Sequence, residues 1–342
     1  GDDVDLPAAL VDRIVRACGW MPLAVRIAAA RLRPPHQVEI DELVKQLEHP
    51  DHSLAALDDG SRSVARTFAD SWSAMPDAQG RLFAVLSVHP GATFDAWAAA
   101  TMVDSPVGDV RRALRGLVDA SLLELAGPER YAFHDLIRSV AAHYATTTLS
   151  ADDRNAARIR LLSAYLTAAQ QADVAVTPSR HREPVVSPPP SAPPAPFDSP
   201  SGAAEWLAVE QDNLVRAIET AAQYGEHDTC WKLAYAIRDH LFRTMAIDAW
   251  VRSHTTALAA ARRTGDLWAV AVTLNNLGLA YALSHRPDEA DRHYVEALDL
   301  FRGLGDTYGE ANTLGHLAWT AYLRTDYAVA QERARSALAI SQ

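Results

Sequence analysis

The stretch that organises this chain reads Leu122-Leu123-Glu124-Leu125-Ala126-Gly127-Pro128-Glu129-Arg130-Tyr131-Ala132-Phe133-His134-Asp135-Leu136-Ile137-Arg138. Two short strand-like runs flank a Gly-Pro turn, and the second leads directly into a helical pattern. This order predicts a β-hairpin followed by a helix. His134 and Asp135 stand at the junction, where Asp135 is expected to cap the helix. Residue type favours capping over ligand sensing at this corner.

Upstream of the hairpin, the pattern predicts three helices over 79–88, 93–103 and 107–120, an order typical of a winged-helix domain. In a DNA reader the third helix would enter the major groove. Its cationic residues are Arg111, Arg112 and Arg115. Because Asp109 and Asp119 lie among them, an ordinary salt-bridged face is favoured over base reading.

Composition predicts a mainly α-helical, cytoplasmic protein. The chain has 342 residues, 49% of them hydrophobic, and a net charge of -11, which argues against broad binding to a phosphate backbone. Cys18 and Cys230 are the two cysteines, far apart in sequence, so neither a disulfide framework nor a cysteine zinc site is expected. No apolar run is long enough to span a bilayer. The acidic start without Met predicts a fragment.

The second half of the chain repeats with a period of 40 residues. Gly225, Gly265 and Gly305 mark this spacing, as do Ala257, Ala297 and Ala337. Such a period with two helices in each unit predicts stacked helical hairpins that form an α-solenoid. Leu274-Asn275-Asn276-Leu277-Gly278-x-Ala280-Tyr281, with Pro287-x-Glu289-Ala290 and Tyr294-x-x-Ala297-Leu298, closely resembles a tetratricopeptide repeat. We expect the array to continue beyond Gln342 in the parent protein.

These patterns divide the chain into five segments. Nine of the nineteen prolines lie between Pro178 and Pro200, which predicts an extended, mobile spacer rather than a peptide ligand for another domain. The segments are a helical subdomain (1–76), a winged helix (77–149), a connecting helix (150–176), a Pro-rich linker (177–202) and the repeat array (203–342).

Two further motifs resemble those of NB-ARC nucleotide-binding regions in STAND-class signal-transduction ATPases. Gly19-x-x-Pro22-Leu23-Ala24 is similar to the GLPLA motif, with Trp20-Met21 as a departure. Leu82-Phe83-x-x-Leu86-Ser87-Val88-His89-Pro90-Gly91 and Tyr131-x-Phe133-His134-Asp135-Leu136-Ile137-Arg138 resemble the winged-helix part of bacterial NB-ARC transcriptional regulators, nearest the SARP and LuxR-like antibiotic-pathway activators. Phe133 stands where the family usually has Met.

The resemblance implies a nucleotide switch. Pro22 would pack on the adenine and His134 would contact the β-phosphate of ADP, with Gly19 and Asp135 supporting them. The intact parent would bind ADP or ATP with Mg²⁺ and act as a slow ATPase. A protein, peptide or small effector on the repeats would favour an open form that oligomerises and brings a DNA-binding domain, missing from this chain, to a promoter.

The chain itself lacks the sequence GxxxxGK[ST], so it is predicted to be a non-enzyme that binds no nucleotide tightly alone. His49 and His52 flank Asp51 in a loop, but no metal site is expected. Two other functions stay open. One is a winged-helix DNA binder that uses Arg111, Arg112 and Arg115, and the other is a repeat scaffold without nucleotide switching.

Overall fold

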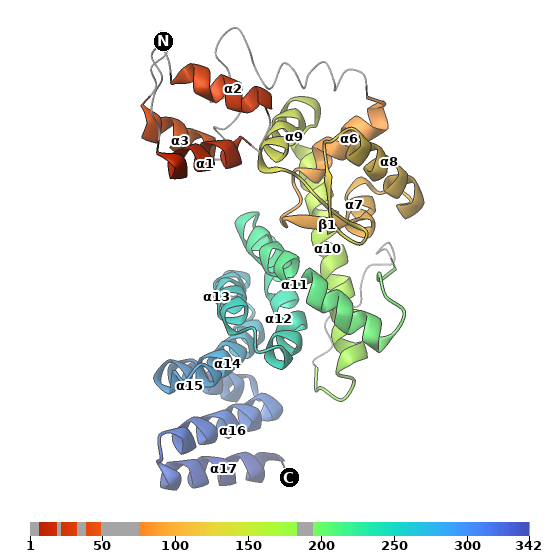
Figure 1. Ribbon diagram of the computed structural model, residues 1–342. Helices are drawn as coiled ribbons and strands as arrows, with labels where there is room; N and C mark the ends of the chain where they lie inside the picture. The colour runs from red at the N-terminus through yellow and green to blue at the C-terminus, as the bar shows by residue number, and fades with distance from the viewer. Residues whose placement is uncertain (1–6, 19–21, 33–38, 49–74, 183–193, 342) are drawn as a thin grey trace. The chain divides into compact units, whose positions relative to one another are not determined.

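Figure 1 shows the computed structural model, which describes residues 7–18, 22–32, 39–48, 75–182 and 194–341. The chain divides into two compact units, residues 1–161 and 162–342, and the boundary falls inside a single long helix. Helices dominate both units, which confirms the mainly α-helical fold class. In the described part of the chain, no helix is both long and apolar enough to cross a membrane.

Three short helices begin the first unit: α1 (Ala8–Ala17), α2 (Pro22–Arg31) and α3 (Ile40–Glu48). The apolar pattern predicts helices over 6–17, 23–33 and 38–48, so each bound agrees within two residues. Pro22 is the first residue of α2, where its fixed φ suits a helix start. Leu43, Val44 and Leu47 form the buried stripe of α3. The spacing of Val64, Phe68 and Trp72 also predicts a helix over 61–75, but this segment and the Asp51 loop lie outside the described residues, apart from Met75.

The next domain combines helices with a three-stranded antiparallel sheet of order β1-β3-β2. Its elements are α6 (Asp77–Leu86), β1 (Thr93–Asp95), α7 (Ala96–Val103), α8 (Val107–Asp119), β2 (Glu124–Gly127), β3 (Arg130–Ala132) and α9 (Asp135–Thr148). The hairpin and following helix predicted from the opening stretch are present. Residues 93–95 were predicted to be helical, and this was wrong: they form β1, in which Phe94 is paired with Tyr131 of β3. Helix α7 starts only after Asp95, whose carboxylate accepts a hydrogen bond from Ala98 N at 2.7 Å.

The core of this domain is aromatic. Phe94 lies 5.9 Å from Phe133 and 6.3 Å from Tyr131 between ring centroids, and Phe83 of α6 meets Phe133 edge-on at 5.5 Å. All four side chains are buried. Because strand and helix ends meet on these rings, the core fixes where β3 turns into α9.

Helix α10 (Ala151–Val176) links the two units, and the second unit continues with helical hairpins. Its helices are α11 (Pro200–Gln223), α12 (His227–Arg243), α13 (Ile247–Thr264), α14 (Leu267–Leu283), α15 (Pro287–Leu304), α16 (Thr307–Leu323) and α17 (Tyr327–Ser341). Helix α11 begins three residues before the predicted boundary, because Pro200 is tolerated in the first helical turn and Ser199 Oγ accepts a hydrogen bond from Gly202 N at 3.1 Å.

The 40-residue period appears directly in the helix starts. Helices α12, α14 and α16 begin 40 residues apart, and so do α13, α15 and α17. Gly225, Gly265 and Gly305 adopt φ values of 80°, 75° and 70°, the left-handed conformation that ends one hairpin and admits the next. Each hairpin also turns on a left-handed residue other than glycine, at Met245, His285 and Thr325.

Close helix contact inside a repeat depends on glycine. A Cβ added at Gly278 of α14 would lie 2.6 Å from Tyr294 Cε1 of α15, so a larger residue could not be placed without movement. Tyr294 is fully buried and belongs to the core shared by α14, α15 and α16. The absence of a side chain at Gly278 therefore lets α14 and α15 approach closely.

Candidate functional site

His134 ends the sheet and begins α9. It occupies the N-cap position, one residue before the position predicted for the cap, but its side chain makes no capping hydrogen bond. The imidazole is 46% exposed, and its Nε2 lies 3.2 Å from Glu124 Oε2 of β2. Asp135 is the first residue of α9, so the prediction that Asp135 is the N-cap was wrong by one residue, because the strand pairing ends at Ala132.

The other residues assigned to nucleotide binding are described less fully. Gly19 lies outside the described residues, and only the backbone is described for Pro22 and Asp135. Pro22 and Asp135 each stand at the first position of a helix, α2 and α9 respectively. Their roles, and that of His134 as phosphate contact, stay predictions.

A second residue of the same motif has a role that sequence analysis did not identify. The guanidinium of Arg138 donates hydrogen bonds to the carbonyls of His89 (3.1 Å), Gly91 (2.8 Å) and Ala92 (3.3 Å), and it lies 5.3 Å from the Phe133 ring centroid. These hydrogen bonds join helix α9 to the turn between α6 and β1, and we call this contact the Arg138 clamp. Arg138, His89 and Gly91 all belong to the motifs that carry the family resemblance, but the separation of more than 45 residues in sequence concealed the contact.

The buried side chain of His89 stabilises the turn that takes part in the Arg138 clamp. Its Nδ1 accepts a hydrogen bond from Gly91 N at 3.0 Å, and its ring lies 5.4 Å from that of Phe94. Burial, reinforced by the charge of Arg138, lowers the pKa of His89 to about 3. The imidazole is therefore neutral at physiological pH and acts as a hydrogen-bond acceptor in the turn.

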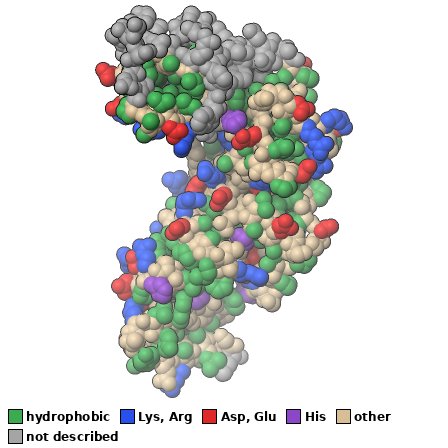
Figure 2. All heavy atoms as spheres, in the orientation of Figure 1, with side chains coloured by type: hydrophobic (Ala, Val, Ile, Leu, Met, Phe, Trp, Pro, Cys, Tyr) green, Lys and Arg blue, Asp and Glu red, His purple; other side chains and the backbone are tan. Residues whose placement is uncertain are grey.

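The three arginines of α8 lie on an exposed face. Arg111 Nε is 2.9 Å from Glu129 Oε2, and Arg115 Nη2 is 3.7 Å from Glu129 Oε1 in the β2–β3 turn. Arg112 pairs with Asp109 at 3.5 Å. Figure 2 shows basic side chains over α8 with acidic ones beside them. This is the mixed, salt-bridged surface that the charge pattern favoured.

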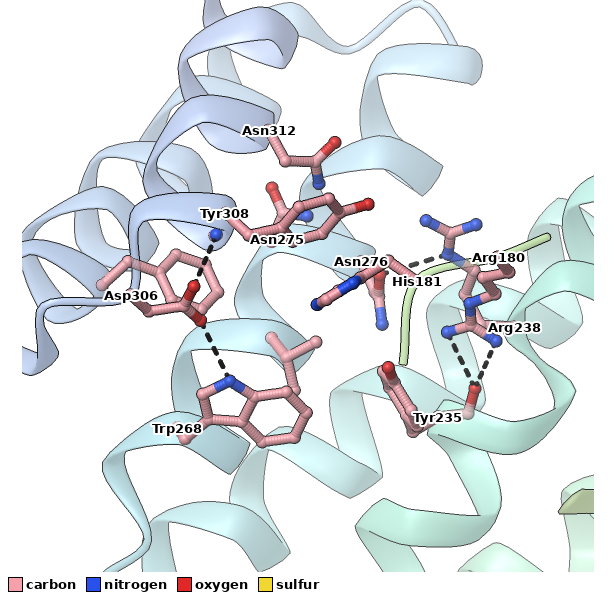
Figure 3. A pocket seen from close by; sticks show the side chains of 13 residues that line it. Arg180, His181, Tyr235, Arg238, Trp268, Asn275, Asn276, Asp306, Tyr308 and Asn312 are labelled. Carbon is pink, nitrogen blue, oxygen red and sulfur yellow. Dashed lines mark hydrogen bonds between the residues drawn. The ribbon is translucent and has the colours of Figure 1, made fainter. Parts of the chain in front are cut away.

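The second unit contains a polar pocket, which we call the repeat groove. It is lined by residues of α12, α14, α15 and α16, by the loop before α16, and by the segment that follows α10 (Figure 3): Arg180, His181, Tyr235, Arg238, Trp268, Val272, Asn275, Asn276, Phe301, Asp306, Tyr308, Gly309 and Asn312. Several of these positions are 40 residues apart, such as Trp268 and Tyr308, or Val272 and Asn312. The 40-residue period could therefore have indicated which residues line the groove, because equivalent positions of stacked repeats face the same side.

Residues at the start of the predicted linker contribute to this groove. The Arg180 guanidinium lies 4.5 Å from the Tyr235 ring centroid, and its two Nη atoms are each 3.4 Å from the Tyr235 carbonyl oxygen. The His181 ring lies 3.8 Å from that of Tyr308. The expectation of a mobile spacer therefore does not hold for residues 177–182.

The guanidinium groups of Arg180 and Arg182 are both held by the buried carboxylate of Asp173. Asp173, near the end of α10, lies 3.0 Å from Arg180 Nη1 and 2.6 Å from Arg182 Nε, and its side chain is only 4% exposed. Arg182 also donates to the carbonyls of Asp173 and Thr177. These charge-assisted hydrogen bonds explain why a short stretch after a helix adopts one conformation.

The floor of the groove is a buried polar layer. Arg238 Nε donates to Asn276 Oδ1 at 3.2 Å, and burial lowers the pKa of Arg238. Asn275 Oδ1 accepts from Thr313 Oγ1 and lies 3.0 Å from His316 Nδ1. Asn276 Nδ2 is buried without a hydrogen-bond partner. Asn276 therefore brings an unsatisfied buried donor to the lining of the groove.

Neither metal nor thiol chemistry is apparent in what the structure describes. Within the described ranges, no group of three or more His, Cys, Asp or Glu residues could hold a metal ion. Both cysteines are buried free thiols. Burial raises the pKa of Cys18 to about 11 and that of Cys230 to about 12, so both are protonated at neutral pH.

Comparison with known proteins identifies the repeats and the relatives of the chain. Residues 252–342 match the tetratricopeptide repeat family. The chain is 29% identical to regulatory protein AfsR of Streptomyces coelicolor over 96% of its own length and 37% of that protein. It is also 29% identical to AfsR of Streptomyces griseus, over 89% of this chain and 35% of that protein.

The chain is therefore similar to the AfsR regulatory proteins over most of its own length. The family match over residues 252–342 confirms the predicted C-terminal tetratricopeptide repeats, and the chain spans about a third of the length of the AfsR proteins. Among solved structures, a STAND protein with a tetratricopeptide repeat sensor from Pyrococcus horikoshii matches 94% of this chain and 60% of its own, at 15% identity and a TM-score of 0.35.

Proposed function

We propose that this AfsR relative is the regulatory and sensor part of a nucleotide-switched transcriptional regulator. In the closed state, ADP would lie between a P-loop domain outside this chain, Pro22 and His134. A partner on the repeats would favour the open, ATP-bound state, which would oligomerise and bring a separate DNA-binding domain to a promoter. Residues 77–149 would form the winged helix of this switch.

The observation that carries the proposal is the position of His134. Its imidazole is exposed at the first turn of α9 and is not used to cap the helix. Helix N-termini favour negative charge, and an imidazole placed there adds a hydrogen-bond donor for a phosphate oxygen. The motif that resembles the family's phosphate sensor thus presents an exposed imidazole whose described partner is Glu124.

Glu124 gives the proposed contact a competitor inside the protein. Its carboxylate lies 3.2 Å from His134 Nε2, the atom that would face the phosphate. A phosphate placed against Nε2 would be repelled by this carboxylate, so the binding of ADP would require the Glu124 contact to open. The Glu124 contact would then lower the affinity for ADP, so that the closed state could still open.

The test is calorimetric titration of ADP and ATP into the parent protein, extended upstream to include its P-loop. We expect His134→Ala to weaken ADP binding at least tenfold. His143→Ala is the matched control, because His143 is an exposed histidine on the same helix. Binding of ADP that is indifferent to His134 would refute the assignment.

The same variants address regulation in cells. His134→Ala or Asp135→Val in the full-length protein should give transcription without the inducing signal, since the closed state would lose a nucleotide contact. Unchanged basal transcription would count against the switch. This chain alone contains no P-loop sequence, and we expect it neither to hydrolyse ATP nor to bind nucleotide tightly.

DNA reading by α8 is the rival function. The contacts of Arg111 and Arg115 with Glu129 weaken it, because side chains that reach bases would first have to leave this carboxylate. The rival predicts salt-sensitive DNA binding by this chain that is abolished by Arg111→Glu and Arg112→Glu. A chain that binds no DNA in a filter or mobility assay would exclude it.

A further inference from the structure

The repeat groove already contains a short piece of peptide. Arg180 and His181 follow α10 directly and reach two different helices of the array, Tyr235 on α12 and Tyr308 on α16 (Figure 3). The Arg180 side chain is only 11% exposed. A segment expected from composition to be a spacer instead makes the contacts of a bound ligand.

The contacts define what the groove recognises. A guanidinium stacks on the Tyr235 ring and donates to the Tyr235 carbonyl, while the Asp239 carboxylate lies 3.9 Å from Arg180 Nε. One residue further, a flat ring packs on Tyr308. Cation–π stacking, a backbone acceptor and a carboxylate together select arginine, and the Tyr308 face selects a planar side chain beside it.

The segment leaves part of the groove unfilled. A cavity of about 80 Å³ remains among the lining residues. Asn276 is 3% exposed, and its Nδ2 has no hydrogen-bond partner. A ligand with a carbonyl or carboxylate oxygen at this place would gain a hydrogen bond that the chain's own segment does not make.

We propose that the repeat groove between Tyr235 and Tyr308 binds an extended peptide carrying an arginine next to a planar ring, and that residues 179–182 occupy this site within the chain until such a partner replaces them. The partner also presents an acceptor oxygen to Asn276. This inference rests on the proposed function only in naming the repeats as the place where a signal arrives.

Tethering sets the conditions for exchange. Because the segment is joined directly to α10, its effective concentration at the groove is on the order of millimolar. A free peptide therefore binds the intact chain more weakly than it binds a chain whose groove is empty. Its apparent affinity for the intact chain falls in proportion to the fraction of molecules whose groove is open. A partner displaces the segment when the free energy of its additional contacts exceeds the free energy that tethering gives the segment.

The experiment measures binding of the fluorescent peptide acetyl-Thr-Pro-Ser-Arg-His-Arg-amide to the 342-residue chain by polarisation. The groove is emptied by Arg180→Ala with His181→Ala, while Arg182 is kept so that Asp173 retains a partner. We expect the emptied chain to bind the peptide at least tenfold more tightly than the wild type. Adding Tyr308→Ala to the emptied chain should abolish this gain.

Tyr322→Ala is the matched control, because Tyr322 is an exposed tyrosine on the same helix as Tyr308 and does not line the groove. Equal binding by the emptied and wild-type chains, or no binding to an emptied chain whose circular dichroism is native, would overturn the proposal.

A second measurement avoids altering the segment itself. Trypsin cleaves after Arg180 only when the segment leaves the groove, so Tyr308→Ala should speed this cleavage at least tenfold, and Tyr322→Ala should leave it unchanged. Equal rates in the two variants would overturn the proposal. Neither experiment uses nucleotide or DNA, so failure here leaves the ADP switch standing, and failure of ADP binding leaves the groove standing.

Discussion

Replacing Arg138 with methionine should loosen the first unit at a predictable place. The change keeps an unbranched apolar stem and removes the donors to the carbonyls of His89, Gly91 and Ala92. Hydrogen bonds from charged groups contribute about 1.5–3 kcal/mol each, but they are not additive, and the 3.3 Å contact to Ala92 is long and exposed. The two shorter bonds therefore set the expected loss at about 2–4 kcal/mol.

The assay should be local, because a chain of two units has no single free energy of unfolding. We would measure hydrogen exchange in peptides from α6 and α9, with peptides from α14 and α16 as an internal reference. A loss of about 2 kcal/mol corresponds to exchange about 30-fold faster. The reference peptides should not change.

Arg112→Met is the control, because the Arg112 side chain is 81% exposed and pairs only with Asp109 of its own helix among the contacts described. It should leave exchange in α6 and α9 unaltered. If Arg138→Met accelerates exchange in α6 and α9 by less than threefold, water satisfies the three carbonyls equally well, and the reasoning about the clamp is wrong.

Three further predictions concern the repeats and the sheet. Gly278→Ala should destabilise the array by about 1–3 kcal/mol despite the better helix propensity of alanine, because the new methyl meets the buried Tyr294 ring; a urea midpoint equal to that of the wild type would refute this. Burial and the charge of a nearby arginine lower the pKa of His254 to about 3 and that of His316 to about 4, so these groups stabilise the repeats fully above pH 6.5. This stability should fall as the pH drops from 6.5 toward 4, and His316→Gln should flatten the decline in a urea titration repeated at each pH. Glu124→Gln should tighten binding of ADP to the extended parent by a few fold, since an exposed pair contributes about 0–1 kcal/mol, and weaker binding would contradict the competition.

Sequence alone determined the elements that depend on local chemistry or on repetition. The hairpin was predictable from the turn at Gly127-Pro128, and the helix starts of the array were predictable from the glycines spaced by 40. A left-handed turn residue and a periodic apolar face can be recognised in a single sequence. The glycine contact of Gly278 could be predicted for the same reason. The turns at Met245, His285 and Thr325 escaped prediction, since these residue types rarely signal a positive φ.

Only the tertiary structure decided the contacts between residues distant in sequence. Composition marked residues 177–182 as the start of a spacer, yet Asp173 neutralises two of their arginines and Tyr235 and Tyr308 bind their side chains. Residues 93–95 likewise joined a sheet because Tyr131 was there to pair with Phe94. A local pattern records propensities of about 1 kcal/mol or less per residue. The buried ion pairs of Asp173 and the ring contacts between distant segments together outweigh these propensities.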